Sequence, residues 1–263
     1  MKFKEERPLY LLEEIASILR GENGCAWDRE QTHESLKPYL IEEAYEACEA
    51  IEKKDTENLR EELGDLLYQV YAHAQIAREE GRFTIDDVAR AIAEKLINRH
   101  PHVFGDEKAS TPQEVIERWE KIKKKEKAGR ESILDGVPAQ LPSLLKAYRV
   151  QQKASRIGFD WGAVEGAVKK LDEEVAEFKD ALAQNAGKAG TAIEGEIGDV
   201  LFSVVNVSRL AGVNPEDALG RTVEKFMRRF KFIEREAASR GGRIEEMSLE
   251  EMDTLWEEAK RRE

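Results

Sequence analysis

The sequence repeats one acidic pattern twice, and this repeat constrains the fold more than any other feature. In the second half, Glu173-Glu174-Val-Ala-Glu177 is followed after one loop by Glu196-Ile-Gly-Asp199. The first half has the same order in Glu42-Glu43-Ala-Tyr-Glu46 and Glu62-Leu-Gly-Asp65. Residues three and four apart share a helix face, so two antiparallel helices would line one cleft with these carboxylates. Such a cluster needs cations among its oxygens, which predicts a divalent-metal site in each half.

The alternative is that these glutamates form an ordinary solvated helix face. Charged residues make up 37% of the chain, and a single E-E-x-x-E pattern in such a chain is more often solvent-exposed surface than a metal site. Two copies of both acidic boxes in the same order favour the metal-site interpretation.

Hydrophobic spacing predicts a chain made of helices alone. No segment shows convincing strand alternation, and Ala, Glu, Lys, Leu and Arg are abundant whereas Pro is scarce. The expected helices are 8–20, 35–53, 55–80, 84–98, 111–127, 144–155, 163–184, 192–210, 214–239 and a last one that opens at Ser248. Glycine and proline break the pattern at residues 129–142. We therefore expect a domain at 1–128, a linker at 129–142 and a domain at 143–263.

Charge and composition limit the classes of binding partner and the cellular compartment that we expect. A net charge of -12 argues against non-specific nucleic-acid binding, and no uncharged apolar run approaches the length of a membrane span. The first residues contain no apolar signal core, and Cys25 and Cys48 are too few for a disulfide scaffold. We expect a cytoplasmic protein without nucleic-acid or membrane partners.

Basic and aromatic residues follow the acidic boxes in the same order in both halves. Each half has a Lys and an Arg four residues apart, and later a Trp and a Lys four residues apart. These residues are Lys95, Arg99, Trp119 and Lys123 in the first half and Lys225, Arg229, Trp256 and Lys260 in the second. Carboxylates suit Mg²⁺, with Mn²⁺ as an alternative ion, while the basic pair can neutralise phosphates and Trp can stack on a base.

Each of these residues also has a plainer interpretation. A Trp considered singly is more often a packing residue, and a Lys and an Arg near a helix end can simply complement its dipole. Asp28 and Asp160, beside a Trp in the two loops, are expected to cap or orient rather than to bind metal. The four histidines lie outside the acidic boxes, so a di-iron bundle is not supported.

Taken together, these motifs resemble the MazG family of nucleoside triphosphate pyrophosphohydrolases in its two-domain form. The matching stretches are 27–33, 39–46, 61–65, 99–104, 158–161, 173–177, 196–199 and 225–230. The resemblance implies tandem all-α domains of four-helix-bundle type, completed by homodimerisation. It also implies Mg²⁺-dependent hydrolysis of an NTP to NMP and pyrophosphate.

The same resemblance assigns roles to individual residues. The metal ligands would be Glu174, Glu177, Glu196 and Asp199 in the second half, with Glu43, Glu46, Glu62 and Asp65 as counterparts. Lys225 and Arg229 would contact phosphates, and Trp256 and Lys260 would border the nucleotide, as would Lys95, Arg99, Trp119 and Lys123 in the first half. Glu173 and Glu42 are extra carboxylates that would tune a metal or accept a proton from water. The second loop lacks the Gln-Thr-His run of the first.

The main functional hypothesis is an enzyme that attacks the α-phosphate of canonical or damaged (d)NTPs and limits their accumulation. One alternative is a nucleotide-sensing regulatory dimer with little turnover. A purely structural bundle that binds no nucleotide is a further alternative. The sequence leaves the preferred base and sugar open.

Overall fold

The computed structural model describes residues 7–108, 111, 114–115, 118–119, 122, 132–184 and 190–263. In these residues all regular elements are helical, which confirms the expected all-α fold. The chain divides into two compact units, residues 1–128 and 129–263, and each is described by itself.

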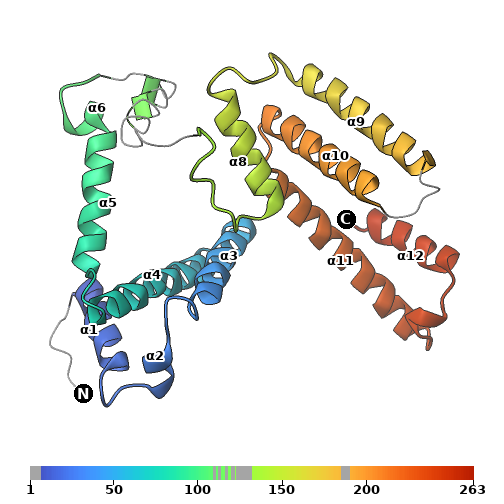
Figure 1. Cartoon of the computed structure of the whole chain (residues 1–263). Helices are drawn as coiled ribbons and strands as arrows, with labels where there is room; N and C mark the ends of the chain where they lie inside the picture. Colours follow the sequence, from blue (N-terminus) through green and yellow to red (C-terminus); the bar gives the residue numbers. More distant parts are fainter. Residues whose placement is uncertain are drawn as a thin grey trace. The chain divides into compact units, whose positions relative to one another are not determined.

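The first unit is built on one pair of long helices. Helices α3 and α4 lie side by side and run in opposite directions (Figure 1). Helix α1 packs on α4 and also contacts the short α2, while α5 follows α4 and leads into the single turn of α6. The helices are α1 Pro8–Arg20, α2 Ala26–Glu30, α3 Lys37–Lys53, α4 Thr56–Glu79, α5 Ile85–Arg99 and α6 Pro101–Phe104.

A two-residue connection holds α3 against α4. Lys54 adopts φ 57° and ψ 31°, the left-handed conformation that ends many helices. Asp55 then caps α4 by accepting a hydrogen bond from the backbone N–H of Asn58 at 3.1 Å. So short a turn forces the two helices to run antiparallel, which brings the first pair of acidic boxes face to face.

The second unit repeats the central pair and adds a helical hairpin. Helices α9 and α10 lie side by side, α8 packs against both α10 and α11, and α12 folds back on α11 (Figure 1). Buried Phe232 and Ile233 of α11 meet Leu255 and Ala259 of α12 in a small apolar core. The elements are α8 Ser143–Ser155, α9 Val164–Gln184, α10 Thr191–Leu210, α11 Pro215–Ser239, the 3-10 turn Ile244–Glu246 and α12 Leu249–Arg261.

Predicted helix starts agree with the structure where a capping side chain marks them. Thr84 and Asp87 form a reciprocal capping box at α5, as do Ser248 and Glu251 at α12. Helices α2 and α6 were not predicted, because one or two turns are too short for a periodic apolar pattern. The helix expected from Ser35 begins at Lys37 instead.

The structure does not decide two of the sequence-based expectations, the helix at 111–127 and the linker at 129–142. Most of the helix expected at 111–127 lies outside the described residues. The extent of the linker at 129–142 stays a prediction, although Lys153 of α8 donates to the carbonyls of Ile133 and Asp135 at 3.0 and 2.9 Å. As for membranes, among the described helices we find none whose length and apolar character would let it cross a bilayer.

Candidate metal centre

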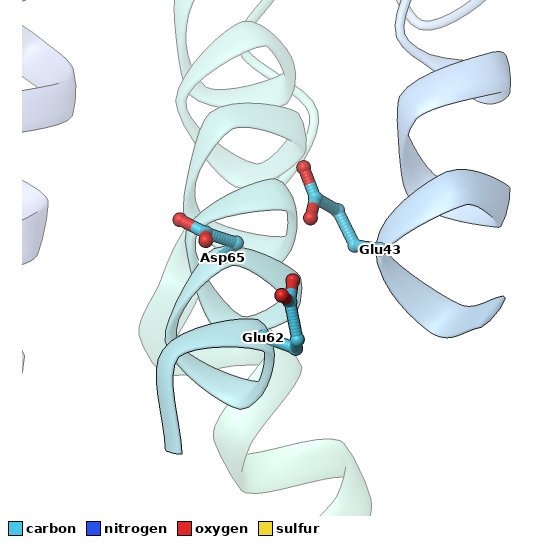
Figure 2. Close-up of side chains that lie close together, drawn as sticks. All are labelled: Glu43, Glu62 and Asp65. Atoms are coloured by element: carbon cyan, nitrogen blue, oxygen red, sulfur yellow. The ribbon is translucent and has the colours of Figure 1, made fainter. Parts of the chain in front are cut away.

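Three carboxylates meet between α3 and α4 in the first unit. Glu43 comes from α3, and Glu62 and Asp65 come from successive positions on one face of α4 (Figure 2). Each offers an oxygen, and these oxygens all lie within 4.8 Å of one another. Glu43 and Glu62 are half-buried and Asp65 is exposed, so the cluster lies at the rim of the helix pair and opens to solvent.

The second unit places the matching residues in the same arrangement. Glu174 of α9 meets Glu196 and Asp199 of α10, again with oxygens within 4.8 Å of one another. Here Glu174 is buried, with 8% of its surface exposed. The acidic boxes therefore build two similar oxygen clusters, each of which could hold a metal ion.

The electrostatics of the first cluster fit a site made for a cation. Burial raises the pKa of Glu43, and so do the neighbouring charges of Asp65, Glu46, Glu62 and Glu42. Burial, followed by Glu46 and Asp65, likewise raises the pKa of Glu62. Carboxylates that raise one another's pKa in this way gain most from a bound cation.

The second cluster contains a cation that we did not anticipate from the sequence. The Nζ atom of Lys170, one turn before the acidic box, lies 2.9 Å from Oε1 of Glu173 and 2.9 Å from Oε1 of Glu174. Hydrogen bonds to Glu174 and then Glu173 raise the pKa of Lys170 well above its usual range. The spacing of i to i+3 and i+4 from Lys170 to the two glutamates was the available signal.

Several predicted acidic residues lie beside the two close clusters rather than within them. Glu46 and Glu42 contribute charge next to Glu43. Burial raises the pKa of Glu177, and the charge of Glu174 adds to this effect. Glu173 is exposed and held by Lys170. Their predicted roles as ligands or as proton acceptors stay predictions.

In the second unit, the predicted basic and aromatic residues meet on α11 and α12. Arg229 lies with its Cζ atom 5.3 Å from the centre of the Trp256 ring, and its Nη2 atom is 2.5 Å from Oε2 of Glu263. Trp256 also packs on Phe226 at 5.2 Å between ring centres and borders the apolar core. Trp256 therefore serves packing and still lies against Arg229 of the basic pair. Lys225 contributes charge near Glu263, and Lys260 pairs with Glu257 at 2.6 Å.

The corresponding residues of the first unit are less fully described. Lys95 is an exposed residue of α5, and Arg99 is the last residue of that helix. Trp119 lies 6.2 Å from the ring of His100. Lys123 lies outside the described residues, so the structure does not test its predicted substrate role.

In each unit, an arginine holds the loop before the central helix pair by hydrogen bonds or an ion pair. Arg209 of α10 pairs with Asp160, whose Oδ1 also accepts the backbone N–H of Trp161 at 2.8 Å. This bears out the expectation that Asp160 orients its loop. In the first unit, Arg20 donates to the carbonyls of Asp28 and Gln31 at 2.5 and 3.0 Å and pairs with Glu79 at 2.7 Å.

Known proteins share this organisation across the chain. The model of the MazG nucleotide pyrophosphohydrolase domain matches residues 31–104 and 163–233, which contain both clusters. A Thermotoga maritima protein named nucleoside triphosphate pyrophosphohydrolase/pyrophosphatase MazG is 49% identical over 95% of this chain and 96% of its own length. An Escherichia coli nucleoside triphosphate pyrophosphohydrolase is 45% identical over 92% of each chain.

A solved structure of a mazG-related protein from Thermotoga maritima aligns with 44% of this chain and 97% of its own, with 32% identity and a TM-score of 0.38. The sequence comparisons decide the family, because they span nearly the whole chain at more than 40% identity. They also confirm the expectation of an enzyme. The chain belongs to the MazG family of nucleotide pyrophosphohydrolases.

Proposed function

We propose that this chain hydrolyses nucleoside triphosphates and their deoxy forms between the α- and β-phosphates and that Mg²⁺ is required. The observation that carries the proposal is the cluster of Glu174, Glu196 and Asp199, built a second time by Glu43, Glu62 and Asp65. Water would add its oxygen to the α-phosphorus while the bond from that phosphorus to the bridging oxygen breaks. The products would be a nucleoside monophosphate and pyrophosphate.

The donor set fits the proposed ion. Both clusters offer carboxylate oxygens alone, which are the hard ligands that Mg²⁺ and Mn²⁺ prefer. A bound Mg²⁺ would polarise phosphate oxygens and lower the pKa of a water molecule. Glu174, Glu196 and Asp199 would hold the ion in the second unit. Glu177, whose pKa is raised by burial and by the charges of Glu174 and Glu196, would join them as a further ligand.

The remaining residues would bind, orient and accept a proton. Lys225 and Arg229 lie four residues apart on α11 and would neutralise the phosphates, the Arg by paired hydrogen bonds. Trp256 and Lys260 would border the nucleoside. Glu173 would accept the proton of the attacking water, and Lys170 holds its carboxylate in place at 2.9 Å. Removing this class of substrate would limit the accumulation of unwanted nucleotides in the cytoplasm.

The test is product analysis in oxygen-18-labelled water. The purified chain is incubated with each NTP and dNTP, with and without Mg²⁺. Attack at the α-phosphorus places the label in the monophosphate, whereas attack at the β-phosphorus places it in pyrophosphate. Glu196→Gln should reduce release by the second unit, while Glu194→Gln, an exposed neighbour on the same helix, should not. Binding of NTP without any release would favour the regulatory-dimer alternative.

We also propose that two copies of the chain associate. The apolar side chains of α10 are divided in the structure, because Val205 is fully buried whereas Ile197, Leu201 and Val204 are 44%, 49% and 40% exposed. A pair of helices covers only one face of each helix, and a second pair would complete a four-helix core. Light scattering should report a dimer, and Leu201→Glu should shift it to monomer. A monomeric wild type would contradict this proposal.

A further inference from the structure

A carboxylate lies on the basic pair of the second unit. The Oε2 atom of Glu263 accepts hydrogen bonds from Nε and Nη2 of Arg229 at 3.1 and 2.5 Å. Its Oε1 atom lies 3.8 Å from Nη2 of Arg228, and the charge of Lys225 also acts on this carboxylate. Glu263 therefore lies among three cations of one short stretch of α11, and two of them are the residues expected to contact phosphates.

The packing of α12 on α11 brings Glu263 to this place. The two helices share a small apolar core, and near the end of α12 the Cζ atom of Arg262 lies 4.6 Å from the centre of the Phe232 ring. Arg229 lies about one turn before Phe232 on α11. The residue that follows Arg262 therefore meets Arg229 as a consequence of the fold.

The contact occupies donors of Arg229 that a phosphate would use. The side chain of Arg229 is only 15% exposed, because Trp256 lies 5.3 Å from its Cζ atom and Glu263 covers its Nε and Nη2 atoms. An arginine binds carboxylates and phosphates most strongly through two neighbouring N–H groups. Both kinds of oxygen accept from the same donors, so a nucleotide must displace Glu263 before it can use them.

The surrounding cations keep Glu263 in its charged form. Hydrogen bonds from Arg229 lower the pKa of Glu263, and the charges of Arg229, Arg228 and Lys225 lower it further, so the carboxylate is ionised at neutral pH. A triphosphate carries more negative charge than one carboxylate and can extend over several cations. It can therefore displace Glu263, but its net gain is smaller because an existing ion pair is broken.

The first half of the sequence has an acidic residue at the same spacing. Glu263 follows Lys260 by three residues, and Glu126 follows Lys123 by three residues. Glu126 lies outside the described residues. The duplicated order of Trp, Lys and Glu nevertheless includes this carboxylate in both halves.

We propose that Glu263 is an internal competitor of the substrate, which occupies the donors of Arg229 until the phosphates of a nucleoside triphosphate displace it. The inference rests on the proposed function, because that function supplies the phosphate contact of Arg229. Its direct consequence is that nucleotide binding in the second unit is weaker than the cations alone would allow. If Glu263 instead orients Arg229 toward phosphates, removal of its charge would weaken binding, so the two roles predict opposite signs.

The test measures nucleotide binding by the second unit of the full chain. The chain carries Glu43→Gln and Asp65→Asn to disable the first cluster, and a non-hydrolysable α,β-imido analogue of ATP is titrated with Mg²⁺ by calorimetry. Glu263→Gln, which keeps the size of the side chain and removes its charge, should tighten binding by about fivefold. In turnover experiments the same substitution should lower KM by a similar factor and leave kcat unchanged, because Glu263 is displaced in both the substrate complex and the transition state.

Glu258 provides a matched control near the same end of α12. Its side chain is 35% exposed, as is that of Glu263, but it pairs with Arg262 at 2.6 Å. Glu258→Gln changes the net charge equally and should leave the affinity for the analogue unchanged. The gain from Glu263→Gln should disappear when Arg229→Gln is also present, since the competition is for that guanidinium group.

Four results would overturn the inference: unchanged or weaker binding in Glu263→Gln, an equal gain in Glu258→Gln, a gain that persists beside Arg229→Gln, or no binding of the analogue by the parent protein. Pyrophosphate release by the wild type is measured separately, so the competition can fail while the proposed function stands. A wild type that binds the analogue without releasing pyrophosphate from ATP would instead contradict the proposed function.

Discussion

The two units carry the same carboxylates in the same order but balance their charge differently. In the second unit, Lys170 stands one turn before the acidic box and lies 2.9 Å from Glu174. At the same place, three residues before Glu42, the first unit has Tyr39, whose ring packs against Trp27. The two units therefore differ at this position, which holds a cation beside the second cluster and a tyrosine in the first unit.

This difference has consequences for metal binding. A site that already contains Lys170 gains less Coulomb energy from an added cation, because that cation must replace an existing ion pair. The first cluster has no such partner among the described residues, and the pKa values of Glu43 and Glu62 are raised. We therefore expect the first cluster to bind metal more tightly and the second to require a higher metal concentration.

The largest expected effect follows the removal of one carboxylate from each cluster. Glu62→Gln and Glu196→Gln together should lower Mg²⁺-dependent pyrophosphate release by roughly 100-fold or more, since metal stabilisation of the transition state is worth several kcal/mol. The single variants then give the share of each unit. If the double variant keeps wild-type turnover, neither cluster is the catalytic centre.

The second largest effect is expected on metal affinity, when Lys170 and Tyr39 are each replaced by the residue of the other unit. Lys170→Tyr should lower the Mg²⁺ concentration for half-maximal binding to the second unit by about tenfold, a modest share of the Coulomb energy because Lys170 is partly exposed. Tyr39→Lys should have the opposite effect on the first unit. The readout is calorimetric titration of Mg²⁺, with the exposed Lys169→Met as control. Unchanged midpoints in both exchanges would show that Lys170 does not compete with metal.

The sequence predicted the carboxylate clusters because helical spacing and a short connection between two helices determine them. Helical spacing places Glu62 and Asp65 on one face, and the short connection at Lys54 and Asp55 turns that face toward Glu43. The repeat of the pattern in both halves then distinguishes these residues from the many glutamates of solvated helix faces.

What the sequence did not predict depends on contacts between segments far apart in the chain. The burial of Gln69, whose Oε1 atom has no hydrogen-bond partner among the described residues, is visible only once the helices of the first unit are packed together. The exposure of Leu201 beside the buried Val205 likewise depends on which neighbour covers α10, because helical spacing places both residues, four apart, on one face. Lys170 is different, because its spacing of three and four residues from Glu173 and Glu174 already indicates an ion pair in the sequence.

The units should also respond differently to acid. All four histidines lie between residues 33 and 102, and in the first unit His33 stacks on His73 with their Nδ1 atoms 2.8 Å apart. Burial lowers the pKa of His73, and the charge of His33 adds to this effect. The unfolded chain therefore takes up a proton here more readily than the folded chain. This contribution to stability is complete above the ordinary His pKa of about 6.5 and is lost as the pH falls below it.

Denaturant unfolding at about pH 7.5 and about pH 5.5 measures this difference. The free energy of unfolding of the first unit should fall with acid, and His73→Asn should flatten that dependence even if it lowers stability at both values. The variant is placed at His73 because that ring has the lowered pKa, whereas His33 also lies 3.8 Å from Glu80 through its Nε2 atom. An equally steep pH dependence in His73→Asn would contradict the assignment.

The smallest expected effect tests what the units have in common, the glycine inside each second acidic box. Gly64 and Gly198 lie within helices, where Gly costs about 1 kcal/mol relative to Ala, and a Cβ atom at either position would meet no described atom within 4 Å. Gly64→Ala and Gly198→Ala should therefore raise the free energy of unfolding by up to about 1 kcal/mol.

We expect these two substitutions to lower pyrophosphate release as well, because in both units a substrate or a second copy would approach the helix closely beside the carboxylates. Gly220→Ala, in an equally open helical position outside the boxes, should stabilise without loss of activity. If Gly198→Ala behaves like Gly220→Ala, the glycine has no part in the site, and the resemblance between the units reduces to their carboxylates.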